Sequence, residues 1–183
     1  PSLYIFPTKS YSKYMPTLYL MLGYPGSGKT TASKLIHELT GAQHMWADQE
    51  RRIRFDKPTH SHEENLKLYD ALNHKAQALL EDGQSVIYDT NFNFFRDRQR
   101  MREIAEQTNA EVVLIWVRTP KETAKERATQ NASQQGTRVL GDMPEDAFER
   151  ISGNMEPPHE DEDFVELDGT QIGKEYIAEK LGL

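Results

Sequence analysis

One short glycine-rich run constrains this chain more than any other feature of its sequence. Residues 23–30 read Gly-Tyr-Pro-Gly-Ser-Gly-Lys-Thr and match G-x-x-x-x-G-K-[ST], the pattern called the P-loop. The apolar run Thr17–Leu22 precedes it and predicts a buried strand. Residues Lys29–Thr40 carry apolar side chains at helical spacing, and Gly41 predicts the end of that helix. A glycine turn between such a strand and helix predicts a site for nucleotide phosphates.

Each part of the P-loop has a physical task in ATP binding. Glycines let backbone N–H groups turn toward phosphate oxygens, and the following helix directs the positive end of its dipole at the same anion. Lys29 is expected to reach the β- and γ-phosphates as a catalytic residue, and the Thr30 hydroxyl is expected to bind Mg²⁺. The predicted ATP-binding residues are Gly23, Pro25, Gly26, Ser27, Gly28, Lys29, Thr30 and Thr31. The alternative is a glycine turn with no ligand, which the flanking strand and helix disfavour.

A second acidic position follows another apolar run. Residues 85–88 (SVIY) predict a strand, and Asp89 comes directly after it. An aspartate at that point commonly orients Mg²⁺, so Asp89 joins Thr30 as a predicted metal residue; the alternative is a turn cap. Thr90 stands where motor-type ATPases commonly carry a glutamate that positions the attacking water. That difference disfavours a dedicated ATP hydrolase.

Strand and helix patterns alternate along the rest of the chain. Predicted strands cover residues 17–22, 43–46, 85–88, 111–117 and 164–167. Helices are predicted over 29–40, from the Ser61 cap to Gly83, over 96–108, in a segment that Thr119 caps and Pro120 opens, and over 146–151 and 171–183. This alternation predicts a single α/β domain over residues 15–183, with a parallel sheet covered on both faces. Met15 stands directly before the first strand, so residues 1–14 are expected to be an added or processed leader.

Two polar segments are harder to interpret. Residues 48–62 are polar and irregular, which predicts a surface loop or mobile cover. Ser61 and Glu64 then form a capping-box pattern at the start of the next helix. Four arginines alternate along the predicted helix 96–108 and favour a solvated face, with a substrate groove as the alternative; they are Arg96, Arg98, Arg100 and Arg102.

Composition limits the kinds of partner. The 22 basic and 29 acidic residues give a net charge of −7, which disfavours a broad nucleic-acid surface but leaves a local basic groove possible. The absence of cysteine excludes disulfides and thiolate zinc sites. No apolar run approaches the length of a membrane span, so we expect a cytoplasmic protein without a membrane partner. The sequence gives no indication of oligomeric state.

Three pieces together resemble the P-loop kinases around polynucleotide 5′-kinase and the zeta-toxin-like branch, and AAA-type ATP-binding proteins more widely. These pieces are residues 23–31, Asp48 with Arg51 three residues later, and the triplet Asp89-Thr90-Asn91. The resemblance covers about residues 18–127. It implies the three-layer α/β/α P-loop NTPase fold, with a five-stranded parallel sheet in the order 2-3-1-4-5. It also implies that ATP lies at the carboxyl ends of the strands, with a small lid at about residues 131–144.

The resemblance also implies roles for acceptor-binding residues. Asp48 corresponds to the general base that takes the proton of the attacking hydroxyl, and Arg51 to an arginine that holds a substrate phosphate. Asn91 is expected to contact the same substrate. The alternatives are a helix cap for Asp48 and a solvated surface charge for Arg51.

Lid arginines in this group usually lie one turn apart on a helix. Arg127 fits the first of these positions and is expected to be catalytic, whereas Asn131 stands at the second. Arg138 could supply the missing arginine from the loop and is expected to bind substrate. The departure at Asn131 weakens the lid assignment.

These residues favour Mg²⁺-dependent transfer of the ATP γ-phosphoryl group to a hydroxyl of a small molecule or a nucleic-acid 5′ end. One alternative is an ATPase or nucleotide-dependent switch without an acceptor. The other is a nucleotide-binding module with degenerate chemistry. The sequence does not identify the acceptor.

Overall fold

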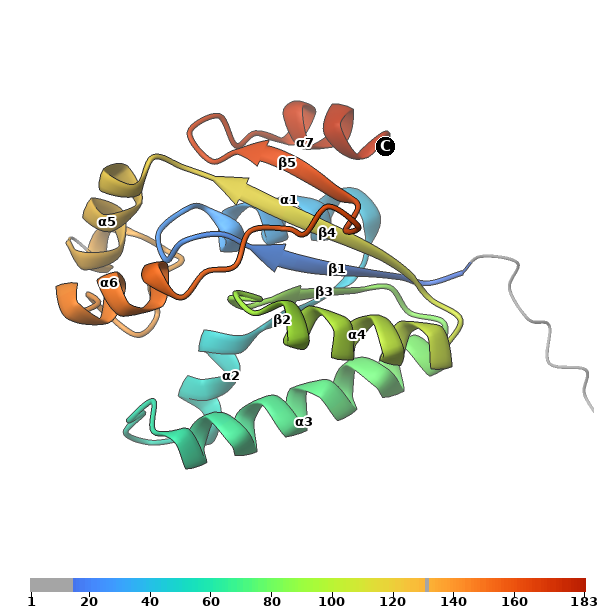
Figure 1. Ribbon diagram of the computed structural model, residues 1–183, viewed down its shortest axis with the longest axis horizontal. Coiled ribbons are helices and arrows are strands. Elements are labelled where there is room, and N and C mark those ends of the chain that lie inside the picture. Colours follow the sequence, from blue (N-terminus) through green and yellow to red (C-terminus); the bar gives the residue numbers. More distant parts are fainter. Residues whose placement is uncertain (1–14, 131) are drawn as a thin grey trace, which may run out of the picture.

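A five-stranded parallel sheet forms the centre of the molecule (Figure 1). The computed structural model describes residues 15–130 and 132–183. Its strands are Thr17–Leu22 (β1), Gln43–Trp46 (β2), Val86–Asp89 (β3), Glu111–Arg118 (β4) and Phe164–Asp168 (β5). They lie in the order β2-β3-β1-β4-β5, and every neighbouring pair is parallel. The predicted fold class and strand order are confirmed.

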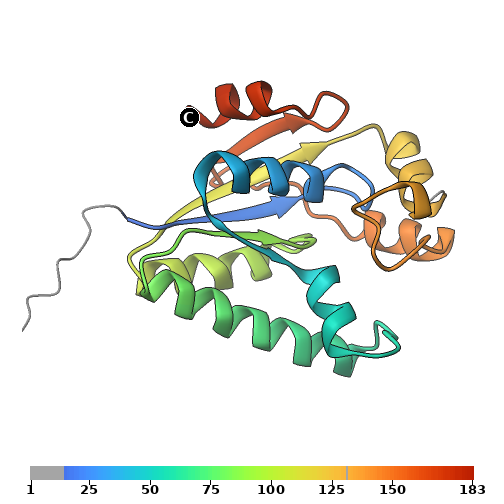
Figure 2. The same cartoon turned by 180° about the vertical axis from the view of Figure 1, so that it is seen from behind.

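Helices cover both faces of this sheet (Figures 1 and 2). They are Lys29–Thr40 (α1), Ala47–Arg54 (α2), His62–Glu81 (α3), Phe95–Gln107 (α4), Lys121–Thr129 (α5), Glu145–Gly153 (α6) and Lys174–Leu181 (α7), with a 3-10 turn at Ala132–Gln134 (η1). Helices α3 and α4 lie side by side on one face, and α1 and α7 pack together on the other. Among the described helices, none combines the length and apolar character needed to cross a membrane.

Strand β1 supplies the core on both faces because its successive side chains point in opposite directions. Leu18 and Leu20 pack in the cluster beneath α3 and α4. Tyr19 and Met21 pack in the cluster beneath α1 and α7. Because the strand is buried on both sides, its sequence is a continuous apolar run. Its carboxyl end is therefore held firmly where the P-loop begins.

The segment after β2 differs from the prediction. Residues 47–54 form helix α2, so the irregular loop expected over 48–62 is confined to the residues between α2 and α3. Asp48 and Glu50 lie in its first turn, and basic side chains lie in its last turn, which suits the helix dipole. Charged residues dominate its sequence, so no apolar stripe announces the helix. The Ser61 cap is confirmed, since its Oγ accepts a hydrogen bond from the Glu64 N–H.

Three smaller expectations also need correction. Arg98 does not lie on a solvated face: its side chain is fully buried and pairs with Glu162. Thr119 does not cap α5 through its side chain, because its hydroxyl donates to the Ser27 carbonyl at 2.8 Å. The last helix is shorter than expected and begins at Lys174. The leader predicted at residues 1–14 lies outside the described residues.

Candidate functional site

The P-loop backbone can exist only with glycines at its turning points. Gly23, Gly26 and Gly28 have φ values of 146°, 77° and 106°, in the region that side chains disfavour. A Cβ on Gly23 would lie 2.4 Å from the Val117 carbonyl oxygen, and one on Gly26 would lie 2.2 Å from the Ala124 carbonyl oxygen. The loop is therefore held tightly between β1, β4 and α5.

Lys29 is buried inside this loop. Its Nζ donates hydrogen bonds to the carbonyl oxygens of Gly23 and Tyr24, both at 2.8 Å. Burial lowers the pKa of the Lys29 ammonium to about 8, although the carboxylates of Asp89 and Asp48 oppose this shift. The ammonium is thus preorganised at the loop, where a phosphate would replace the carbonyl oxygens as its partner.

A cavity of about 1350 Å³ opens above the P-loop. The residues of the loop that line it are Pro25, Gly26, Gly28, Lys29, Thr30 and Thr31, whereas Gly23 and Ser27 are buried and do not line it. Ligand cavities in proteins are usually about 300–1000 Å³, so this one has room for a nucleotide and a second molecule. That size fits a reaction between two bound substrates.

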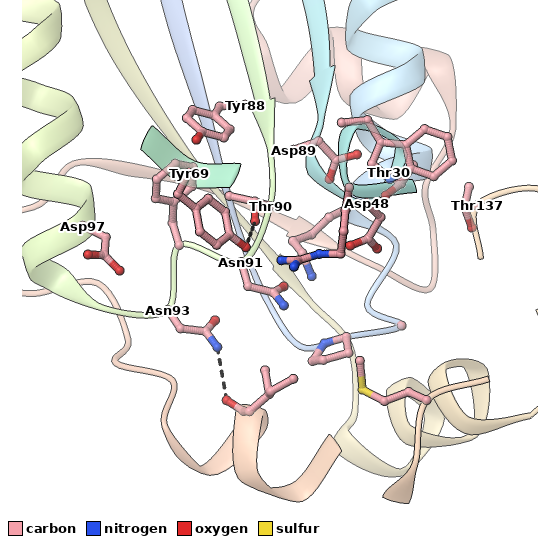
Figure 3. Close-up of a pocket in the computed structure, with 18 of the residues that line it drawn as sticks. Thr30, Asp48, Tyr69, Tyr88, Asp89, Thr90, Asn91, Asn93, Asp97 and Thr137 are labelled. Carbon is pink, nitrogen blue, oxygen red and sulfur yellow. Dashed lines mark hydrogen bonds between the residues drawn. The ribbon is translucent and has the colours of Figure 1, made fainter. Parts of the chain in front are cut away.

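Asp89 ends β3 beside the P-loop, where Figure 3 shows it grouped with Thr30 and Asp48. Its side chain is buried, and its Oδ2 lies 2.9 Å from the Nε2 of His44. His44 in turn stacks on Trp46 with ring centroids 6.1 Å apart. Carboxylate and hydroxyl oxygens are the ligands that Mg²⁺ prefers, so Asp89 and Thr30 fit a magnesium ion between the P-loop and β3. His44 was not predicted, because only the pairing of β2 with β3 brings it to Asp89.

Asp48 lies in the first turn of α2 and faces the cavity. Burial raises the pKa of its carboxyl above the ordinary value, and the neighbouring Asp89 raises it further. The positive charges of Arg138, Arg51 and Lys29 act in the opposite direction. A half-buried carboxylate with a raised pKa, in the same cavity as a phosphate-binding loop, is chemically suited to accept a proton.

Arg51 is buried at the junction of α2 and α3. It pairs with Glu64 through Nη1, and its Nη2 donates to the Asn65 Oδ1 at 2.7 Å. Burial would raise the pKa of Glu64, but hydrogen bonds from Thr59 and Arg51 outweigh it and lower the pKa to about 2. Arg51 is therefore not the solvated charge considered as an alternative. It lines the cavity, and its contact with a substrate phosphate stays a prediction.

Two further arginines reach the cavity from the α5 side. Arg127 donates from Nη1 to the Gly169 carbonyl at 3.0 Å. Arg138 donates from Nη2 to the carbonyls of Ala128 and Gly141, at 2.8 and 3.2 Å. Both line the cavity, and Arg138 is close enough to Asp48 for each charge to affect the pKa of the other. Asn131 lies outside the described residues.

Gly169 joins the turn after β5 to the P-loop and was missed in the sequence. A Cβ there would lie 2.0 Å from the Thr119 Oγ1 and 2.2 Å from the Ser27 carbonyl oxygen. A side chain at this position would displace the P-loop, and no local sequence pattern indicates that. Long-range packing alone makes the requirement visible.

Asn91 also lines the cavity, on the segment that leaves β3. Around it, the Tyr69 hydroxyl lies 3.1 Å from the Thr90 Oγ1 (Figure 3). The Tyr88 hydroxyl donates to the Asn73 Oδ1 at 2.9 Å. Tyr69 and Asn73 are four residues apart on the inner side of α3. Polar residues at that spacing within an apolar stripe were the signal that could have identified them.

The family comparison agrees with this arrangement. The family described as "AAA domain" matches residues 18–158, which is more than half of the chain. The chain belongs to the AAA domain family. Its predicted resemblance to P-loop kinases is confirmed at the level of family and fold.

The proteins that resemble this chain in sequence share about a third of their aligned residues with it or fewer. A shikimate kinase of Persephonella marina is 29% identical over 124 residues, covering 62% of this chain and 67% of the relative. An uncharacterised protein of Mycobacterium tuberculosis is 32% identical over 108 residues, covering 52% of this chain. The aligned part spans only 22% of that relative's length.

Solved structures share the fold. A candidate kinase from Chloroflexus aurantiacus superposes with a TM-score of 0.74 at 22% identity, covering 92% of this chain and 98% of that one. A gluconokinase from Sinorhizobium meliloti gives a TM-score of 0.65 at 18% identity, covering 92% and 91%. A chain of the Pnkp1/Rnl/Hen1 RNA repair complex gives 0.65 at 22% identity, covering 80% and 46%. These superpositions show that the chain has the P-loop kinase fold. Sequence identities this low do not identify a substrate.

Proposed function

We propose that this AAA domain transfers the γ-phosphoryl group of Mg·ATP to the hydroxyl of an acceptor molecule. The observation that carries the proposal is the position of Asp48, a half-buried carboxylate with a raised pKa in the same cavity as the P-loop. ATP binding alone does not need a carboxylate there, since a negative charge near three phosphates weakens binding. The names of the similar proteins, a shikimate kinase and a gluconokinase among them, support the same class of reaction.

In the proposed step, the acceptor oxygen forms a bond to the γ-phosphorus while the bond from that phosphorus to the β–γ bridging oxygen breaks. Asp48 takes the hydroxyl proton, and ADP leaves with the electron pair of the broken bond. Lys29 and Arg127 offset the charge that develops on the phosphoryl oxygens. Thr30 and Asp89 would hold Mg²⁺, which supplies further charge neutralisation at the phosphates.

Hydrolysis without an acceptor is the competing reaction. Thr90 follows Asp89, and its Oγ1 lies 3.1 Å from the Tyr69 hydroxyl. A threonine engaged in this way is a poor substitute for a carboxylate that activates water. This contact favours transfer to an alcohol over a dedicated ATPase.

Asp48→Asn tests the proposal. The substitution should leave ATP binding as tight as in the parent or tighter, because it removes a negative charge near the phosphates. It should slow acceptor phosphorylation by about 10²–10⁴-fold, the usual contribution of general-base assistance. Background ATP hydrolysis should change much less. The measurement is a pair of rate constants on the same preparation, one for acceptor phosphorylation and one for phosphate release.

Asp56→Asn is the matched control, because Asp56 is an exposed carboxylate on the loop after α2. It should leave both rates unchanged. Equal slowing of both reactions by Asp48→Asn, or slowing of neither, would remove Asp48 as the base for the acceptor and with it the main support for a kinase.

A further inference from the structure

The cavity continues beyond the P-loop into a second part between α3, α4 and α6. Its lining there is rich in side chains that form hydrogen bonds without carrying charge: Tyr69, Asn73, Asn91 and Asn93. Charged side chains from the same helices also line it: Lys67 and Asp70 of α3, Arg96, Asp97 and Arg100 of α4, and Arg150 of α6. The proposed phosphoryl transfer gives no role to Asn73, Asn93 or Asp97. This part of the cavity is where the acceptor would lie.

Asn93 is the most constrained of these side chains. It is only 6% exposed, and its Nδ2 donates to the Ile151 carbonyl in α6 at 3.1 Å. A carbonyl can only accept, so this contact fixes which end of the amide is nitrogen. The Oδ1 then lies on the side away from α6, as Figure 3 shows.

That Oδ1 is buried and has no hydrogen-bond partner among residues 15–130 and 132–183. An unpaired buried acceptor is unfavourable, and few such groups persist in folded proteins without a reason. The residue lines the cavity, so a ligand is the available source of a donor. An amide oxygen cannot pair with a phosphate or carboxylate oxygen, so the ligand must present a donor such as a hydroxyl at this point.

The backbone around Asn93 is held on both sides. Its carbonyl accepts from the Glu156 N–H at 2.8 Å, and the Phe95 N–H donates to the Glu156 carboxylate at 2.5 Å. The Phe92 carbonyl accepts from the Arg98 Nη1 at 2.9 Å, and Arg98 is itself fully buried. Asn93 is therefore preorganised, which is what a recognition residue requires.

Other residues that line the cavity offer complementary groups. The Oδ1 of Asn73 accepts from the Tyr88 hydroxyl, so its Nδ2 is the end left to donate. The Asp97 carboxylate accepts hydrogen bonds. A hydroxyl both donates and accepts, so a molecule with several hydroxyls satisfies a wall that mixes donors and acceptors in this way.

We infer that the acceptor is a small polyhydroxylated molecule, and that Asn93 is a substrate-binding residue that selects it. One hydroxyl of the acceptor lies beside Asp48 and receives the phosphoryl group. A second hydroxyl donates to the Asn93 Oδ1. This inference rests on the proposed phosphoryl transfer and adds the acceptor class to it.

An acceptor panel with γ-labelled ATP tests the class. The probes are ethanol, glycerol, D-ribose, D-glucose, D-gluconate and a 5′-hydroxyl hexanucleotide. We expect labelled product from a polyhydroxylated probe and not from ethanol or the hexanucleotide. Transfer only to ethanol or the hexanucleotide would overturn the inference about the acceptor while leaving the kinase proposal intact. Transfer to no probe would overturn the kinase proposal, and the acceptor class with it.

The role of Asn93 is tested on the accepted probe by deleting its hydroxyls one at a time. With the parent protein, one deoxy analogue should show an acceptor KM raised at least about tenfold, because it leaves a buried acceptor unpaired. Asn93→Ala should raise the KM of the intact probe by about 10- to 100-fold with the KM for ATP unchanged, and the same deoxy analogue should then show no further loss.

Asn154→Ala is the control, because Asn154 is exposed just after α6. It should match the parent in every assay. The deoxy series on the parent needs no variant, so it remains informative if Asn93→Ala fails to fold. Parent KM values that stay within about twofold for every analogue would overturn the role of Asn93, as would identical penalties in parent and variant.

Discussion

At the scale of the residue, burial of Lys29 changes its pKa and should thereby make ATP binding depend on pH. Its pKa of about 8 lies well below the ordinary value of 10.5, chiefly because burial disfavours the charged form. A bound triphosphate favours that charged form, so ATP binding and protonation of Lys29 should be linked. The affinity for ATP then depends on pH near the lowered pKa of Lys29.

We therefore expect ATP affinity to be constant from pH 6.5 to 7.5 and to fall above pH 8, by up to about tenfold per pH unit. Lys29→Ala should bind weakly at pH 7 and lose little more at higher pH. Calorimetric titration with Mg·ATP between pH 6.5 and 9.5 measures both profiles. A parallel fall in parent and variant would assign the pH dependence to another group.

Local sequence patterns predict some residues of the candidate site, whereas others depend on contacts between segments that are far apart in the chain. Lys29, Thr30 and Asp89 follow local patterns that place them at the end of a strand or in a glycine loop. Asn93 and Gly169 matter because of contacts with α6 and the P-loop, which only the folded chain brings together. No window of neighbouring residues carries that information.

At the scale of the element, the buried Arg98–Glu162 pair joins α4 to the segment before β5. Arg98 donates to both carboxylate oxygens of Glu162, and Arg102 and the His159 N–H add further hydrogen bonds. Burial would raise the pKa of Glu162, but these donors outweigh it and lower the pKa from 4.5 to about 2. A depressed carboxyl pKa stabilises the folded state above pH 4.5 and loses that contribution as the pH falls toward 2.

Glu162→Gln should therefore destabilise the protein at pH 7 by about 3–5 kcal/mol, because it leaves the Arg98 charge buried without its partner. It should also flatten the loss of stability between pH 4.5 and 2. Urea denaturation at several pH values measures both effects. Glu160→Gln, at an exposed position in the same segment, is the control and should behave like the parent. An unchanged acid slope in Glu162→Gln would contradict the assignment.

Elements with a clear apolar pattern were predicted well, and polar ones were not. The bounds of β1 and α1 agree with the sequence patterns, because apolar residues recur there at the spacing of a buried strand and of an amphipathic helix. Helix α2 was missed because its buried contacts are made by Ala47 and the paired Arg51, with charged residues between them. A charge buried by pairing looks the same in sequence as a charge in solvent.

At the scale of the whole molecule, charge is distributed unevenly. The chain carries a net charge of −7, yet its cavity is lined by eight Lys and Arg side chains and four Asp side chains. A basic cavity in an acidic protein concentrates a small polyanion such as ATP without attracting long nucleic acids to the rest of the surface. The parallel sheet brings the segments that follow β1, β2 and β3 to the same edge, so the P-loop, Asp48 and Asp89 lie around one cavity.

The central claim is that the γ-phosphoryl group of ATP leaves on an organic acceptor and not on water. The most direct measurement follows γ-labelled ATP with Mg²⁺, with and without a protein-free extract of small metabolites, and divides the label between organic phosphate and orthophosphate. We predict that label enters organic phosphate only when the extract is present, and that Lys29→Ala abolishes this product. Release of label solely as orthophosphate, at the same rate with and without the extract, would contradict the account.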